Sequence, residues 1–288
     1  MKHFVTNRDP TWQNDKGRGI IGALNYLSNQ GMNSFSFLTM NIKGDDKNVY
    51  PYISSTDVLR MDVSKLAQWE IVFEHADKVG MFLHFKMFEQ ENDQLLDSGG
   101  LGKSRMLYYR KMIARFGHHL ALCWNLAEEI TNTLVQIRQF SDYIKETDPY
   151  KHIVVSHTFP YDVALYDELI GYPTFDGPSL QQRPEGVFDL TLRFVEESTA
   201  ANHKWIVTND EQNPASDGVV PDFEDPDHDR IRQLVLWGNI MVCCVLDAYW
   251  NDFFHLFRYI IALKLQFHNR LVVLVSNITL DINMPIVT

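Results

Sequence analysis

The feature that most constrains the fold of this sequence is a regular alternation between amphipathic helical segments and short apolar runs. Apolar side chains recur at helical steps of three and four, and glycines such as Gly31, Gly80 and Gly117 end the helical segments. Alternation of this kind is typical of an α/β protein whose parallel strands are covered by helices. We expect helices at residues 19–29, 66–79, 105–116, 132–146, 187–201 and 229–240.

The short apolar runs predict seven strands, at residues 33–40, 81–85, 119–126, 153–157, 176–180, 205–208 and 241–246. This repeat count favours a (β/α)8 barrel of the TIM type over an open doubly wound sheet, and no GxGxxG turn follows a strand. Because the chain opens with a loop and a helix, we expect an incomplete barrel with its first strand absent and its last strand and C-terminal tail atypical. The predicted organisation is a barrel domain at 1–241 and an atypical segment at 242–288.

Composition and charge exclude several classes of partner. The net charge of −11 argues against nucleic acid, which requires a basic face. The apolar C-terminal tail is interrupted by Lys264 and Arg270, so we expect no membrane span. Three cysteines form no disulfide or zinc-binding pattern, and we therefore expect no metal and no cofactor. The N-terminus carries no apolar core of a secretory signal.

Two apolar runs end in carboxylates. Residues 122–129 (LCWNLAEE) end in Glu128 and Glu129, and residues 204–212 (KWIVTNDEQ) contain Asp210 and Glu211. In a barrel enzyme the active site lies at the C-terminal ends of the strands, and two carboxylates across one cleft are the minimum equipment for hydrolysing a glycosidic bond. The alternative for each run is a plain strand end or a helix N-cap, where acids are also favoured.

Four further motifs carry a family resemblance. They are residues 17–27 (GRGIIGALNYL), 69–73 (WEIVF), 90–94 (QENDQ) and 115–120 (RFGHHL). With these motifs the chain resembles, over roughly residues 9–241, a family of uncharacterised glycoside-hydrolase-like TIM barrels that usually carry an N-terminal immunoglobulin-like domain. That family is distantly similar to apiosidase-type glycosidases. The resemblance implies a barrel acting on a carbohydrate substrate, in a secreted or periplasmic setting.

The same resemblance implies roles for the acids. Residues 124–129 match the family's strand-four acid motif and residues 210–212 its strand-seven motif. By this similarity, Glu129 is the acid/base and Glu211 the nucleophile. Glu128 is the alternate donor, because adjacent carboxylates at a strand end point in different directions. Asp210, Asn125 and His157 are the supporting candidates.

The chain also departs from the family. Glycine is usual at Ala127 and Asn213, and asparagine at Ile130. The family's first strand and accessory domain have no counterpart, and residues 242–247 differ from its glycine-rich eighth strand. These departures predict a chain truncated at both ends, so a barrel that no longer catalyses stays an open alternative.

Four other residues are candidates for binding substrate. Glu91 and Asp93 follow a predicted strand, where barrel loops contact sugar hydroxyls, although both could instead cap a helix. Trp124 and Tyr172 have flat rings that could stack on the apolar face of a sugar, although the neighbours of Trp124 indicate burial in the core.

Three functions remain open from sequence alone. The first is a glycosidase that uses Glu129 and Glu211. The second is a non-catalytic carbohydrate-binding or interaction protein derived from a glycosidase barrel, since an unclosed sheet would loosen the site. The third is a metal-dependent hydrolase that uses His84, His157 and the acids.

Overall fold

Six parallel strands form one curved sheet in the computed structural model, which describes residues 19–44, 48–214 and 228–247. The strands are neighbours in the order in which they occur in the chain, so each connection moves one position along the sheet. They are β1 (Ser34–Leu38), β4 (Phe82–Lys86), β5 (Leu122–Asn125), β6 (Ile153–His157), β7 (Gly177–Gln182) and β8 (Thr208–Gln212). The short strands β2 (Asn41–Ile42) and β3 (Asn48–Val49) form a separate antiparallel pair.

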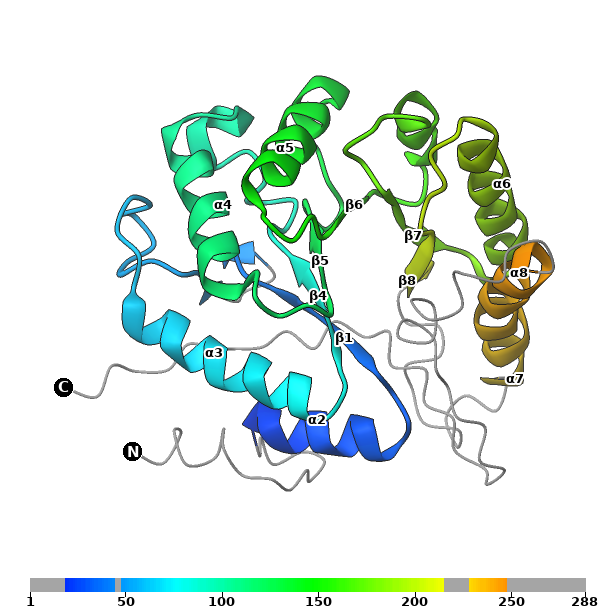
Figure 1. Ribbon diagram of the computed structural model, residues 1–288, viewed down its shortest axis with the longest axis horizontal. Helices are drawn as coiled ribbons and strands as arrows, with labels where there is room; N and C mark the ends of the chain where they lie inside the picture. Colours follow the sequence, from blue (N-terminus) through cyan, green and yellow to red (C-terminus); the bar gives the residue numbers. More distant parts are fainter. Residues whose placement is uncertain (1–18, 45–47, 215–227, 248–288) are drawn as a thin grey trace.

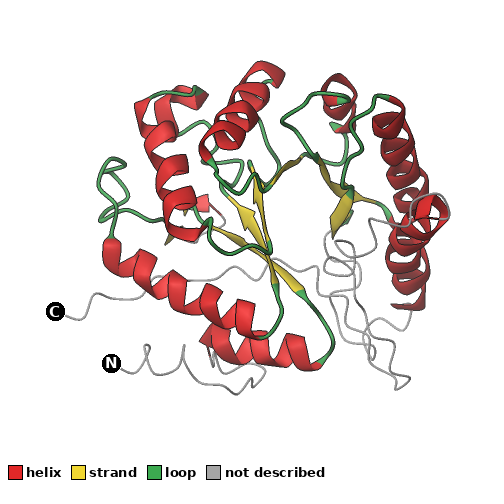
Figure 2. Cartoon of the chain, in the orientation of Figure 1, coloured by secondary structure: helices red, strands yellow, loops and turns green. Residues whose placement is uncertain are grey.

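Helices connect the strands and cover the outside of the curved sheet, as Figures 1 and 2 show. The α-helices are α2 (Gly19–Asn29), α3 (Val63–Lys78), α4 (Lys103–Phe116), α5 (Leu134–Thr147), α6 (Val187–Ala200), α7 (His228–Ile231) and α8 (Gly238–Asp247). Short 3₁₀ segments are η2 (Leu96–Gly99), η3 (Val163–Leu169) and η4 (Pro184–Gly186), and η5 (Arg232–Trp237) is a π-helical turn. The described fold is a partial (β/α) barrel of the TIM type, as the sequence predicts.

Side-chain caps fix where two of the helices begin. Asp62 precedes α3 and accepts hydrogen bonds from the backbone N–H groups of Ser64 and Lys65 at 2.9 and 3.1 Å. Thr133 and Gln136 form a reciprocal capping box at the start of α5. These caps satisfy backbone donors that a helix leaves unpaired at its first turn.

The hydrophobic core lies between the sheet and the helices. Aromatic rings from the strands pack against rings of the covering helices. The ring centroids of Phe37 and Phe73 of α3 are 4.8 Å apart, and those of Phe85 and Phe116 of α4 are 5.6 Å apart. Trp124 packs edge-on against Phe85 at 5.1 Å. Because side chains alternate across a strand, the residues between these apolar positions face the inside of the curve.

The inside of the curve is polar on the central strands. Asn125 of β5 contacts His84 of β4 and Ser179 of β7 across this face. Lys86 of β4 contacts Asp210 of β8. All three side chains are buried. This polar inner face, at the C-terminal ends of the strands, is where a barrel places its chemistry.

One predicted strand is wrong. Residues 241–246 belong to helix α8, which continues the helical run that begins at α7. A short apolar run does not distinguish a buried strand from a buried helix, and this run has no break before it. Gly238 does not end the helix; a Cβ there would lie 3.6 Å from the backbone nitrogen of Phe188, an ordinary van der Waals contact with the start of α6.

The last strand of the described sheet lies later in the chain than predicted. The sequence indicates residues 205–208, whereas β8 spans Thr208–Gln212. The segment before it already runs beside β7, because Ile206 donates its backbone N–H to the carbonyl of Asp176 at 2.8 Å. A Cβ on Gly177 would lie 2.0 Å from the carbonyl oxygen of Ile206, so only glycine permits this approach.

None of the described helices is long and apolar enough to cross a lipid bilayer.

Candidate functional site

A cluster of polar side chains lies toward the C-terminal ends of five neighbouring strands, β4 to β8, and in the loop after β5. The parallel sheet brings these ends together at one edge, although the residues come from segments that lie far apart in sequence. The cluster consists of His84, Lys86, Asn125, Glu128, Glu129, His157, Ser179, Gln181, Asp210 and Glu211.

Lys86 supplies the positive charge of this cluster. Its Nζ atom lies 2.8 Å from Oε1 of Glu128 and 3.5 Å from Oδ2 of Asp210, and its side chain is 1% exposed. Burial would lower the pKa of Lys86, but the two carboxylates outweigh burial and hold the pKa above its usual value. The ammonium therefore stays charged, and it neutralises acids from two different strand ends.

A β-bulge turns two consecutive acids toward the same side. Leu180 of β7 pairs with Asn209, but Gln181 pairs with Glu211, so Asp210 is an extra residue in β8. In a regular strand, Asp210 and Glu211 would face opposite sides of the sheet, whereas a bulge can re-aim one of them. Both carboxylates approach His157 as a result.

His157 lies between these two acids. Its Nδ1 atom is 3.6 Å from Oδ2 of Asp210, and its Nε2 atom is 3.5 Å from Oε2 of Glu211. Burial would lower the pKa of His157, but Asp210 outweighs burial and raises it. Ser179 completes the contact by donating its hydroxyl to Oδ1 of Asp210.

The two acids at the bulge differ in their charge environment. Although burial opposes ionisation of both, Lys86 and His157 hold the pKa of Asp210 well below its usual range. Burial raises the pKa of Glu211, and His157 and Lys86 offset only part of this increase. Asp210 is therefore a fixed negative charge, whereas Glu211 can change protonation nearer to neutral pH.

The two acids after β5 point to different partners. Glu128 is 3% exposed and pairs with Lys86. Glu129 is half-buried and adopts a left-handed backbone conformation with φ of 47°, which is uncommon for a residue other than glycine. Burial raises the pKa of Glu129, His157 offsets part of this rise, and Gln181 donates a hydrogen bond to its carboxylate. Glu129 and Glu211 thus share His157 as a neighbour.

His84 and Asn125 support the cluster from beneath. Burial lowers the pKa of His84 to about 4, so this ring is neutral near neutral pH. Its Nε2 atom lies 2.9 Å from Nδ2 of Asn125 and can accept a hydrogen bond from the amide. The Asn125 amide is also 3.4 Å from Oγ of Ser179.

The arrangement bears on the metal-dependent alternative. The Lys86 ammonium lies between Glu128 and Asp210, so a side chain, and not a metal ion, neutralises these acids. In the part of the chain that the structure describes, the ligand atoms that could share one metal ion lie on Glu70, His118 and His119, away from His84 and His157.

The predicted substrate-binding acids take different positions. Glu91 is exposed and near enough to Glu129 to raise the pKa of that residue. Asp93 is fully buried, and its carboxylate accepts hydrogen bonds from the backbone N–H of Thr131 at 2.5 Å and from its hydroxyl at 2.8 Å. Asp93 therefore anchors the loop that carries Glu129. A direct role for either acid in binding stays a prediction.

The structure does not bring the two predicted aromatic residues into the cluster. Trp124 is fully buried on the helix side of β5, and its indole N–H donates to Oδ2 of Asp148 at 2.9 Å. Tyr172 lies in the segment that leads into β7, and its hydroxyl donates to Oδ2 of Asp142 of α5 at 2.8 Å. Their stacking on sugar rings stays a prediction.

Sequence reasoning missed Lys86, Ser179, Gln181 and Glu89. Lys86 directly follows the predicted strand 81–85, and a charged residue there indicates the catalytic edge of a barrel. Burial raises the pKa of Glu89 to about 9, with Glu128 and Glu91 adding to the shift. Ser179 and Gln181 carry no such signal, because their importance depends on the bulge.

Solved structures of similar fold are glycoside hydrolases. A glycoside hydrolase family 5 protein from Bacteroides vulgatus matches with a TM-score of 0.54 at 16% identity, over 76% of this chain and 52% of that chain. An exo-β-1,4-mannosidase from an Opitutaceae bacterium matches with 0.51 at 12% identity, over 76% and 45%. An endoglucanase from Pseudomonas stutzeri matches with 0.51 at 11% identity, over 75% and 72%.

These likenesses show that the chain shares the barrel fold of glycoside hydrolases. It spans about half the length of the first two structures. No protein-family model and no curated protein matches the chain.

Proposed function

We propose that this protein is a glycoside hydrolase that cleaves its carbohydrate substrate with Glu129 as acid/base and Glu211 as nucleophile. The observation that carries the proposal is the position of His157, whose Nε2 atom lies 3.5 Å from Oε2 of Glu211 and whose charge also lowers the pKa of Glu129. Two acids from separate strand ends thus face one charged ring at the catalytic edge of a barrel.

The electrostatics suit the two roles. Burial raises the pKa of Glu129, which favours a protonated carboxyl that can give its proton to the leaving oxygen. Burial also raises the pKa of Glu211, but His157 and Lys86 oppose this rise and so favour the carboxylate form that attack requires. The carboxylate attacks the anomeric carbon as the bond to the leaving oxygen breaks. Water then cleaves the glycosyl ester, with Glu129 accepting the proton of that water.

Asp210, Lys86 and Glu128 act as positioning residues in this scheme. Asp210 keeps its negative charge beside His157 and so favours the imidazolium form of that ring. Lys86 holds Asp210 and Glu128 in place through buried contacts. Because Glu128 forms a buried ion pair with Lys86, Glu129 is the better candidate for the proton donor.

The mechanism requires a particular spacing of the carboxyl groups. A retaining enzyme holds them about 5–5.5 Å apart, and an inverting enzyme about 6.5–9.5 Å apart. Because Glu211 contacts His157 and the charge of the same ring acts on Glu129, we favour the shorter spacing and retention of configuration. The resemblance of residues 124–129 and 210–212 to a family that is distantly similar to apiosidase-type glycosidases also favours a glycosidase reaction.

The proposal is tested by turnover of a panel of aryl glycosides. Glu129→Gln and Glu211→Gln should each lower kcat by about 10²–10⁴-fold. Azide should restore turnover of activated glycosides by Glu129→Gln and yield a glycosyl azide of retained configuration. Glu146→Gln changes an exposed acid on α5 and serves as the matched control.

Two outcomes would contradict the proposed function. If the parent protein binds oligosaccharides but turns over no member of the panel, it is a carbohydrate-binding protein on a glycosidase fold. If turnover persists unchanged in both glutamine variants, the assignment of Glu129 and Glu211 is wrong.

A further inference from the structure

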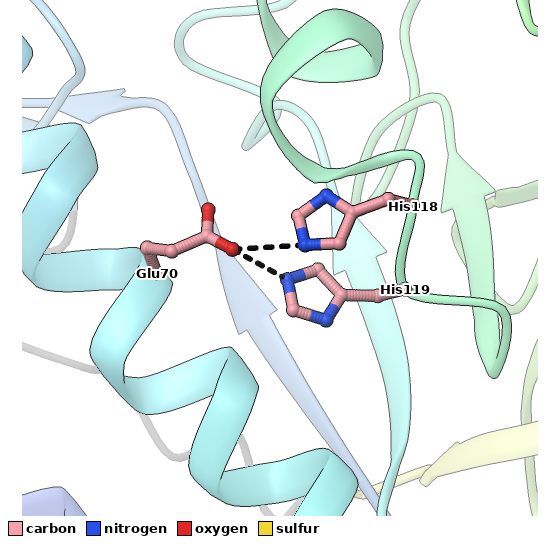
Figure 3. A group of neighbouring side chains, drawn as sticks. All are labelled: Glu70, His118 and His119. Atoms are coloured by element: carbon pink, nitrogen blue, oxygen red, sulfur yellow. Dashed lines mark ion pairs between the residues drawn. The ribbon is translucent and has the colours of Figure 1, made fainter.

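A second cluster of ionisable side chains lies away from the strand ends that carry the candidate site. Glu70 of α3 meets His118 and His119, which lie in the loop between α4 and β5 (Figure 3). The Nε2 atoms of His118 and His119 lie 3.0 and 3.2 Å from the same oxygen, Oε1 of Glu70. The three ligand atoms all lie within 4.8 Å of one another.

The protonation of His119 raises a conflict in this cluster. Its Nδ1 atom lies 2.6 Å from Oδ2 of Asp77, and a carboxylate can only accept, so Nδ1 carries the proton. In the neutral ring, Nε2 is then a bare lone pair that faces the Glu70 carboxylate. His119 is 1% exposed, and its Nε2 atom finds no hydrogen-bond partner within the described ranges. Either a second proton on the ring or a metal ion between the two atoms would satisfy both the lone pair and the carboxylate.

We propose that Glu70, His118 and His119 bind a divalent transition-metal ion, with Zn²⁺ as the best fit. Two imidazole nitrogens and one carboxylate oxygen are a common zinc donor set. Zinc bonds of about 2.0–2.2 Å at tetrahedral angles separate neighbouring ligand atoms by about 3.3 Å. The two separations of 3.0 and 3.2 Å are close to this value.

The residues around the cluster also suit a metal site. Asp77 holds His119 through Nδ1 and so directs the Nε2 lone pair inward, which is the usual arrangement around a metal-bound histidine. Nε of Arg115 lies 3.6 Å from Oε2 of Glu70, the oxygen that the metal does not use, and its positive charge partly balances that carboxylate. His118 is 53% exposed, so solvent can reach the ion and water can fill the fourth position.

A metal here would join α3 to the loop that enters the N-terminal end of β5. The proposed hydrolytic residues lie at the opposite end of that strand, beyond Asn125. The ion would therefore stabilise the barrel by linking α3 to the loop before β5, and it would take no part in the proposed hydrolysis.

The test is titration of the full, metal-stripped chain with zinc chloride near pH 7 by calorimetry. We expect one site and a rise in Tm on binding, because an ion that binds only the folded state stabilises it. Asp77→Asn should weaken binding by about 10–100-fold, as is typical for the partner of a metal-bound histidine. Glu70→Gln and His118→Ala each remove a ligand and should weaken binding more.

The control is Glu74→Gln, an exposed acid one turn further along α3, which should bind zinc as the parent does. Co²⁺ should give the visible absorption of a tetrahedral site in the parent and lose it in His118→Ala. Because His118 is half-exposed, its replacement should not prevent folding. Absence of zinc binding, or affinity unchanged in Glu70→Gln and His118→Ala, would overturn the proposal.

Discussion

The ammonium of Lys86 lies 2.8 Å from a carboxylate oxygen of Glu128, and the two side chains are 1% and 3% exposed. This ion pair joins the end of β4 to the loop after β5, and Asp210 of β8 extends it at 3.5 Å. One buried cation thus neutralises acids from separate parts of the sheet. Several consequences of this arrangement can be measured.

Replacing Lys86 with methionine should destabilise the protein strongly. The change leaves Glu128 and Asp210 buried without their cation, and breaking a buried ion pair in this way costs about 3–5 kcal/mol. Urea unfolding at neutral pH measures the loss. The double variant Lys86→Met with Glu128→Leu should recover part of it, because one uncompensated charge is gone. A double variant less stable than Lys86→Met would contradict the pairing.

Replacing His157 with glutamine should move the pH profile of hydrolysis upward. His157 lowers the pKa of both Glu129 and Glu211, so its removal raises the pKa of each acid. The acidic limb, set by ionisation of Glu211, and the alkaline limb, set by deprotonation of Glu129, should both shift to higher pH. The measurement is kcat/KM against pH. His203→Gln, which changes a ring bonded to the carbonyl of Phe175, should leave the limbs in place.

Glu89 should make the protein less stable as pH rises. Burial raises its pKa from an ordinary value of 4.5 to about 9, so between these values the folded state holds a proton that the unfolded state has lost. The free energy of unfolding therefore falls across this interval. Glu89→Gln removes the effect, and its stability relative to the parent should increase by a few kcal/mol between about pH 5 and pH 9. Parallel pH profiles for the two proteins would contradict the burial of a neutral Glu89.

Two glycines with positive φ should differ in their tolerance of alanine. Gly177→Ala places a Cβ 2.0 Å from the carbonyl oxygen of Ile206 and should cost more than about 3 kcal/mol. Gly80 has φ of +74° with nothing within 4 Å of its Cβ position, so Gly80→Ala should cost only about 1–2 kcal/mol. Chemical denaturation measures both. Equal losses would show that backbone conformation, and not the close approach of β7 to residue 206, dominates.

Much of the fold follows from local patterns. The helix at 19–29 and the strand at 153–157 have the predicted bounds, because each is uniform in its periodicity and is bounded by turn residues. Residues 241–246 were predicted as a strand and form a helix, since six apolar residues fit either structure. Local pattern fails where only packing against another helix, here α6, decides the outcome.

The candidate site was less accessible to sequence reasoning. Runs that end in acids indicate which strand ends to inspect, but adjacent acids such as Asp210 and Glu211 normally face opposite sides of a sheet. Their shared orientation depends on the register between β7 and β8, which is a property of two strands together. The role of Lys86 likewise depends on acids that lie far from it in sequence.

Because of the bulge in β8, the loss of a single codon could remove the proposed catalytic function and leave the fold intact. Deleting Glu211 would leave β8 without an extra residue, restore a regular ladder with β7 and remove the proposed nucleophile in one step. The sheet and its covering helices would have no reason to change. Under the proposed assignment, a chain of this design can therefore lose hydrolysis and keep its barrel without passing through an unfolded intermediate in its evolution.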